Sequence, residues 1–268
     1  MRWKILVLLI SLYSLAYAQS GFTTLGGANF LGYGRAGVNV HGIQSAYLNQ
    51  AGLSEISNTA LDVSLERRFN FEELTTISLA AAKTFGFGTL GLMVSNFGFS
   101  EYNEQKLGLA YARKLNNSIS IGGQLDLLRY NIIQVGSKNL LSFELGMQLK
   151  LNKDFSIGTH IFSPGAIEVN DGTELATRFR VGLMYSPSPK VSVMVDLDKV
   201  VDRTLEYKLG ISYQAVKELQ IRIGVNPTVE MYSLGAMVSL QDRYRIATAI
   251  GIQQNLGNTP AISLQYQN

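Results

Sequence analysis

Apolar residues alternate with polar or small residues along most of the chain. Between Leu141 and Leu151 every second residue is apolar, and serine, glutamate, glycine, glutamine and lysine stand between them. A side-chain period of two is typical of a β-strand whose two faces meet different surroundings. A turn at residues 152–154 follows, and the alternation resumes at Phe155, so this stretch predicts a β-hairpin with long arms.

The hairpin pattern repeats from about residue 59 to the end of the chain and gives roughly fourteen strand-like segments. The connections near residues 86, 116, 153, 188, 216 and 241 are tight, whereas those at about 97–105, 130–139, 163–174, 226–230 and 253–260 are longer. Outer-membrane barrels have an even number of antiparallel strands, short periplasmic turns and longer outer loops. The sequence therefore predicts an all-β fold, a transmembrane antiparallel β-barrel of about fourteen strands over residues 58–268, with both termini periplasmic.

The first eighteen residues have the layout of a signal peptide. Arg2 and Lys4 precede an apolar run from Ile5 to Leu15, and Ala16-Tyr17-Ala18 forms a small-x-small cleavage pattern. The predicted mature protein begins at Gln19. Export, together with the barrel pattern, predicts the outer membrane of a Gram-negative bacterium, with outer-membrane lipid as a partner.

Alternation alone does not decide whether the apolar face points to lipid or into a soluble core. The arms are long, aromatic residues cluster near arm ends, and cysteine is absent, which together favour a barrel in a membrane over the alternative of a secreted soluble β-sandwich that binds a partner. In the barrel the polar face lines the lumen, and we expect these charged residues there: Asp62, Glu66, Arg178, Arg180, Asp196, Arg243 and Arg245.

Residues 19–57 break the alternation and are rich in glycine. A segment of this length ahead of the first strand predicts a plug that enters the lumen from the periplasm. Its stretches 37–40 and 45–53 resemble the N-terminal signature of the FadL-like outer-membrane proteins, a family that includes the PorV/PorQ group of the type IX secretion system. The matching residues are Asn49, Ala51, Gly52 and Leu53, with Gln50 in place of the usual proline. The resemblance implies a fourteen-stranded barrel with an N-terminal plug.

The resemblance also implies two functions. PorV-type proteins are adaptors that bind secreted proteins or secretion-system components, whereas FadL-type proteins take up hydrophobic small molecules through long outer loops. The longest loops expected here, 130–139 and 163–174, have only about ten residues. We therefore expect a PorV/PorQ-like adaptor, with uptake of hydrophobic small molecules as the alternative.

Other chemistry has little support in the sequence. Without Arg2 and Lys4 the 23 basic residues become 21, against 20 acidic ones, so the charge predicts no nucleic-acid partner. Residues 32–37 fit a Gly-x-Gly-x-x-Gly pattern, but no βαβ unit surrounds it. His41 and His160 lie far apart in the sequence, which disfavours a metal site. We expect no catalytic residues, no metal and no cofactor.

Overall fold

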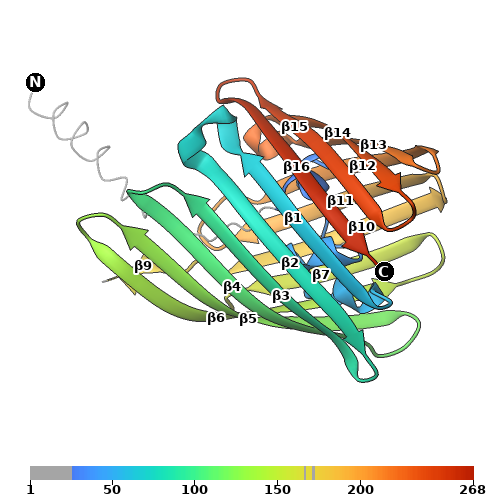
Figure 1. Ribbon diagram of the computed structural model, residues 1–268, viewed down its shortest axis with the longest axis horizontal. Helices are drawn as coiled ribbons and strands as arrows, with labels where there is room; N and C mark the ends of the chain where they lie inside the picture. Colours follow the sequence, from blue (N-terminus) through green and yellow to red (C-terminus); the bar gives the residue numbers. More distant parts are fainter. Residues whose placement is uncertain (1–25, 166, 171–172) are drawn as a thin grey trace, which may run out of the picture.

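The computed structural model describes residues 26–165, 167–170 and 173–268. The predicted signal peptide and residues 19–25 lie outside this part of the chain. The described residues form a closed barrel (Figure 1) built from the following strands: β1 (Thr59–Arg67), β2 (Thr75–Phe85), β3 (Gly88–Gly98), β4 (Tyr102–Lys114), β5 (Ile119–Ile132), β6 (Gly136–Lys150), β7 (Phe155–Phe162), β10 (Arg178–Ser188), β11 (Val191–Val200), β12 (Glu206–Val216), β13 (Leu219–Asn226), β14 (Met231–Leu240), β15 (Tyr244–Gln253) and β16 (Gly257–Gln267).

Every barrel strand pairs with its neighbours in antiparallel fashion, and the first strand pairs with the last. Val63 on β1 lies opposite Leu79 on β2 and opposite Leu264 on β16, so the sheet has no free edge. The prediction of a fourteen-stranded barrel is confirmed. The soluble two-sheet sandwich is wrong, because one sheet closes on itself. Among the described residues no helix is long and apolar enough to cross a bilayer.

The apolar face of the sheet points outward. On β1, Leu61 and Val63 are 42% and 47% exposed, whereas Asp62 and Ser64, which alternate with them, are 0% and 2% exposed. The same alternation of exposed apolar and buried polar or small residues follows the other strands. An exterior of leucine, isoleucine, valine and aromatic side chains is stable against lipid rather than water, so the fold is that of a transmembrane barrel.

The two rims of the barrel differ in their connections. At the turn rim the connections are residues 86–87, 115–118, 151–154, 189–190, 217–218 and 241–243; at the loop rim they are 68–74, 99–101, 133–135, 163–177, 201–205, 227–230 and 254–256. The N-terminal end of β1 and the C-terminal end of β16 both lie at the turn rim, where Ala60 pairs with Gln267. Whether this rim faces the periplasm stays a prediction.

The expected long loops at 97–105, 130–139 and 253–260 are wrong. Strands continue through most of these residues. The part of a strand that extends beyond the lipid needs no apolar outer face, so it keeps its hydrogen bonds to the neighbouring strands but loses the alternation of apolar and polar residues. The start of β6, from Gly136 to Asn139, is exposed yet paired with β5. The connection 163–177 is the long one; within it β8 (Glu168–Asn170) pairs with β9 (Thr173–Glu174).

Aromatic side chains pair on the outside of the barrel near the turn rim. The stacked or tilted pairs are Phe85 with Phe87, Phe87 with Tyr111, Phe155 with Tyr185, and Tyr244 with Tyr266. These positions are those of an interfacial girdle, where amphipathic rings meet lipid head groups.

Candidate functional site

The lumen holds the chain between residues 26 and 57, called here the N-terminal segment. It contains α2 (Ala28–Leu31), η1 (Ile43–Tyr47) and η2 (Gln50–Glu55), and nearly all of its residues are buried. Helix α2 contacts β14, β15, β16 and β1, whereas η2 contacts β3, β4, β5 and β6. In Figure 1 this segment is the blue chain seen within the barrel. Its contacts therefore reach opposite sides of the wall.

Glycines on the inner wall bring the backbone of the N-terminal segment close to the strands. A side-chain carbon at Gly224 on β13 would lie 1.9 Å from the backbone nitrogen of Gly34, and one at Gly122 on β5 would lie 2.5 Å from that of Ala51. Neither position accepts a larger residue without a backbone shift. The many glycines of the polar strand face thus have a packing reason, close backbone approach, which the sequence pattern did not reveal.

The three carboxylates among the predicted lumen residues contact the N-terminal segment directly. Asp62 accepts hydrogen bonds from Asn29 Nδ2 at 2.9 Å and the Tyr47 hydroxyl at 2.6 Å. Asp196 accepts from the backbone nitrogens of Gly37 at 2.6 Å and Val38 at 2.9 Å.

The third, Glu66, forms an ion pair with Arg35, a residue in the left-handed region at φ 68°. Hydrogen bonds to ionised groups are stronger than those between neutral groups. These three carboxylates therefore fix the segment to β1 and β11.

The residues of the family motif lie at the centre of the segment. Asn49 caps η2, since its side-chain oxygen accepts from Ala51 N at 3.2 Å, and its amide donates to the carbonyl oxygens of Val38, Met147 and Thr159. Leu53 and Ala51 are fully buried, and the Gly52 carbonyl oxygen accepts from Gly42 N at 3.0 Å. The motif thus builds the docked conformation of the segment.

Gln50, which departs from the family pattern, uses its side chain to reach the wall. Its amide donates to Glu144 Oε2 at 2.8 Å, and proline at this position would have no such donor. Glu144 also pairs with Lys106, and its Oε2 lies 2.8 Å from His160 Nε2. His160, alone on its strand face in the sequence, is therefore part of a buried ionic cluster.

A second group of charges continues around the wall from this cluster. Arg180 Nη1 lies 3.1 Å from His160 Nδ1, and its Nε lies 3.3 Å from Asp198 Oδ2. Asp198 also pairs with Arg178 at 3.4 Å and with Lys208 at 2.5 Å. The sequence pattern placed Arg178 and Arg180 on the lumen face, but it did not predict that a single carboxylate, Asp198, pairs with both.

Arg243 and Arg245 have different surroundings. Arg245 lines a cavity inside the barrel. Arg243 lies in the exposed turn at 241–243, so its placement in the lumen was wrong. The alternation cannot be extended through this turn, because Gln241 and Asp242 adopt positive φ angles of 52° and 57° and the strand begins again only at Tyr244.

His41 and Glu55 of the N-terminal segment have pKa values shifted from their ordinary values. Burial lowers the pKa of His41. Burial by itself raises the pKa of Glu55, but the hydrogen bonds and positive charges of Lys114 and Lys150, whose Nζ atoms lie 2.7 and 2.9 Å from its oxygens, outweigh it and lower the pKa below its ordinary value. The docked segment thus favours neutral His41 and ionised Glu55.

Apolar side chains line the lumen near the loop rim. Leu128 on β5 pairs with Leu140 on β6, and Tyr130, Phe162 and Leu175 complete a buried cluster with Ile167 against it. A sequence signal exists, since the doublets Leu127-Leu128 and Leu140-Leu141 place apolar residues on both strand faces. The connection 163–177 supplies Leu175 and Ile167 and so covers this cluster.

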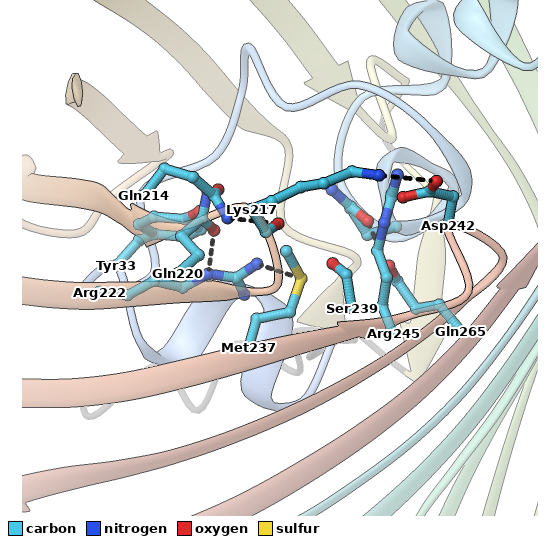
Figure 2. Close-up of a pocket in the computed structure, with 11 residues that line it drawn as sticks. Tyr33, Gln214, Lys217, Gln220, Arg222, Met237, Ser239, Asp242, Arg245 and Gln265 are labelled. Atoms are coloured by element: carbon cyan, nitrogen blue, oxygen red, sulfur yellow. Dashed lines mark hydrogen bonds and ion pairs between the residues drawn. The ribbon is translucent and has the colours of Figure 1, made fainter. Parts of the chain in front are cut away.

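A polar cavity of about 480 Å³ lies on the other side of the N-terminal segment, toward the turn rim. Figure 2 shows that it is enclosed by Tyr33 from the segment, by side chains of β12 to β16, and by Lys217 and Asp242 from two turns. We call it the rim cavity. Its volume is within the range of small-molecule sites.

No family model matches this sequence, and no curated protein matches it. Solved structures do match the fold. The monoaromatic hydrocarbon channel CymD has a TM-score of 0.67 and 14% identity over 93% of this chain and 99% of its own. The toluene transporter TbuX of Ralstonia pickettii has a TM-score of 0.69 and 10% identity over 94% and 99%. A FadL homologue from Pseudomonas aeruginosa has a TM-score of 0.63 and 11% identity over 91% and 99%. The chain therefore has the fold of FadL-like barrels.

Proposed function

We propose that this protein is a FadL-like channel that passes hydrophobic small molecules across the outer membrane of a Gram-negative bacterium, and that the N-terminal segment moves to open it. The observation that carries the proposal is a lipid-facing barrel of FadL-like fold whose lumen is filled by its own chain. Two of the similar structures described above are a monoaromatic hydrocarbon channel and a toluene transporter, which favours the uptake alternative over the PorV/PorQ adaptor.

The loop rim offers a first contact for such a molecule. The apolar cluster of Leu128, Tyr130, Leu140, Phe162 and Leu175 lies inside the barrel at this end, and apolar surface there can exchange its internal contacts for contacts with a hydrophobic ligand. Lys106 lies below, with its ammonium 5.0 Å from the centre of the Phe162 ring. The other connections at the loop rim are short, so the connection 163–177 is the main cover over this apolar cluster.

Passage beyond this cluster requires the N-terminal segment to move, because its backbone contacts the wall at Gly224 and Gly122. A disulfide can test this movement, because the chain contains no cysteine. The hydroxyl of Ser54 in η2 lies 2.9 Å from that of Ser120 on β5, so Ser54→Cys combined with Ser120→Cys places two sulfurs within bonding reach.

The measurement is uptake of a radiolabelled monoaromatic hydrocarbon by cells that express the double-cysteine variant and lack their own FadL-type transporter. We expect slow uptake after oxidation and a return to the wild-type rate after reduction. The single variant Ser54→Cys, treated with the same oxidant, is the control. Equal uptake by oxidised and reduced cells would contradict the movement, and no uptake above cells without the protein would contradict the channel.

A further inference from the structure

The rim cavity contains a buried arginine without an anionic partner. Arg222 on β13 is 3% exposed. Its Nε donates to Gln220 Oε1 at 2.8 Å, and its Nη2 lies 2.8 Å from the sulfur of Met237, which is a weak acceptor. Its Nη1 has no hydrogen-bond partner, and among the described residues no carboxylate lies within ion-pair distance.

Other buried cations of the lumen are paired. Lys106 contacts Glu144 and Asp126, and Arg180 and Lys208 contact Asp198. Taking a guanidinium out of water without a counter-charge is unfavourable, so folded proteins rarely keep one in that state. Arg222 departs from the rule that the rest of this lumen follows, and it does so at the wall of a cavity large enough for a ligand.

The surroundings of Arg222 fix the position of its guanidinium. The Tyr33 ring stacks against it at 4.7 Å between the guanidinium carbon and the ring centre, and the Tyr33 hydroxyl donates to the same Gln220 oxygen at 3.0 Å. Figure 2 shows the guanidinium extended from β13 toward Met237. A planar donor group held in this way is suited to an oxyanion, whose oxygens accept from adjacent N–H groups.

The rest of the cavity adds a second cation and an entrance. Arg245 on β15 lines the same space and forms no ion pair among the described residues, since Asp242, the carboxylate of this cavity, pairs with Lys217 at 3.0 Å. Lys217 and Asp242 lie in exposed turns, which places them at the opening on the turn rim. Side-chain amides of Gln44 and Gln265 supply further polar contacts.

We propose that the rim cavity is a binding site for a small water-soluble anion whose carboxylate or phosphate group is held by Arg222 and Arg245. The volume and the glutamine-rich lining fit an organic acid or a phosphorylated small molecule. The site does not depend on the proposed uptake of hydrophobic molecules, because it lies on the turn-rim side of the N-terminal segment and is polar.

The test is isothermal titration calorimetry with the full-length protein in neutral detergent at pH 7. Sodium citrate and sodium phosphate are titrated separately, with sodium chloride at equal ionic strength as the reference. We expect saturable binding of citrate, phosphate or both, at least tenfold weaker in Arg222→Gln and in Arg245→Gln. Arg113→Gln, which changes an exposed arginine on β4, is expected to bind as the wild type does. Citrate alone identifies an organic acid, whereas phosphate alone identifies the phosphate group.

Thermal unfolding gives a second readout. Without added anion, Arg222→Met is expected to melt at a higher temperature than the wild type, because it removes an unpaired buried charge. With saturating anion the order should reverse, since the wild type gains the binding free energy. The proposal would be overturned if citrate and phosphate gave no more binding heat or stabilisation than chloride, or if both arginine variants bound them as tightly as the wild type. It would also be overturned if Arg222→Met and the wild type melted in the same order with and without the anion.

Discussion

Asp196 should contribute strongly to the docking of the N-terminal segment. Its Oδ2 accepts from the backbone nitrogens of Gly37 and Val38, and the side chain is 2% exposed. Replacing it in Asp196→Ala leaves two buried donors without an acceptor. A hydrogen bond to a charged group contributes roughly 1.5–3 kcal/mol, and the two bonds share one carboxylate, so we expect docking to weaken by about 3 kcal/mol.

Hydrogen exchange followed by mass spectrometry measures this change in the intact protein. If the segment opens and closes faster than it exchanges, a loss of about 3 kcal/mol speeds exchange at residues 37 and 38 by roughly 100-fold, since 1.4 kcal/mol corresponds to a factor of ten. Amides in the ladder between β1 and β16 serve as the internal reference and should be unchanged.

Asp196→Asn keeps an oxygen acceptor of the same shape and should give an intermediate rate. An acceleration below about threefold in Asp196→Ala, with the ladder intact, would refute the idea that this carboxylate anchors the segment. Acceleration of the whole barrel would show instead that the change unfolds the wall.

Three further predictions concern the lipid face, the wall glycines and pH. Leu145→Arg on the lipid face should lower the free energy of unfolding in vesicles by roughly 2–4 kcal/mol, whereas Leu115→Arg in an exposed turn should be nearly neutral by the same urea titration. Gly224→Ala should displace the segment and make it sensitive to limited proteolysis, which an unchanged cleavage pattern would contradict. The pKa values of His41 and Glu55 are lower in the docked segment than in the free one, so protonation of either group favours the undocked state. Docking should therefore weaken as the pH falls below about 6.5, where His41 takes up a proton, and again below about 4.3, where Glu55 does. Hydrogen exchange of residues 38–57, corrected for the intrinsic rate, tests this, and His41→Gln should lack the first step.

The strands and their facing could be predicted from the sequence because both depend on local alternation. A side chain on β1 lies on the lipid face or the lumen face according to its parity alone, as Leu61 and Asp62 show. Odd or even position no longer indicates which face a side chain lies on once a turn or irregularity interrupts the alternation. The alternation is interrupted by the turn before Tyr244, so the prediction for Arg243 was wrong. The paired ends of β5 and β6 were predicted as a loop because they have no apolar face.

The contacts inside the lumen could not be predicted, because they depend on the register between distant strands. Glu144 lies opposite Phe162, and His160 lies opposite Gly146, two positions further along the ladder and on the same face. This register brings the histidine to the carboxylate. The partner of Asp196 is backbone, which has no sequence signature. The absence of a partner for Arg222 likewise becomes visible only when all its neighbours are in place.

The central claim, a barrel that spans the membrane with its leucine face in lipid, can be tested with one tryptophan. The only tryptophan of the chain, Trp3, lies in the predicted signal peptide, so the chain from residue 19 contains none. Leu145→Trp is made in that chain and folded into vesicles of lipids brominated along their acyl chains, with Leu115→Trp as the control at the turn rim. We predict strong fluorescence quenching for Leu145→Trp and weak quenching for Leu115→Trp. Equal and weak quenching at both positions would contradict the membrane-spanning barrel.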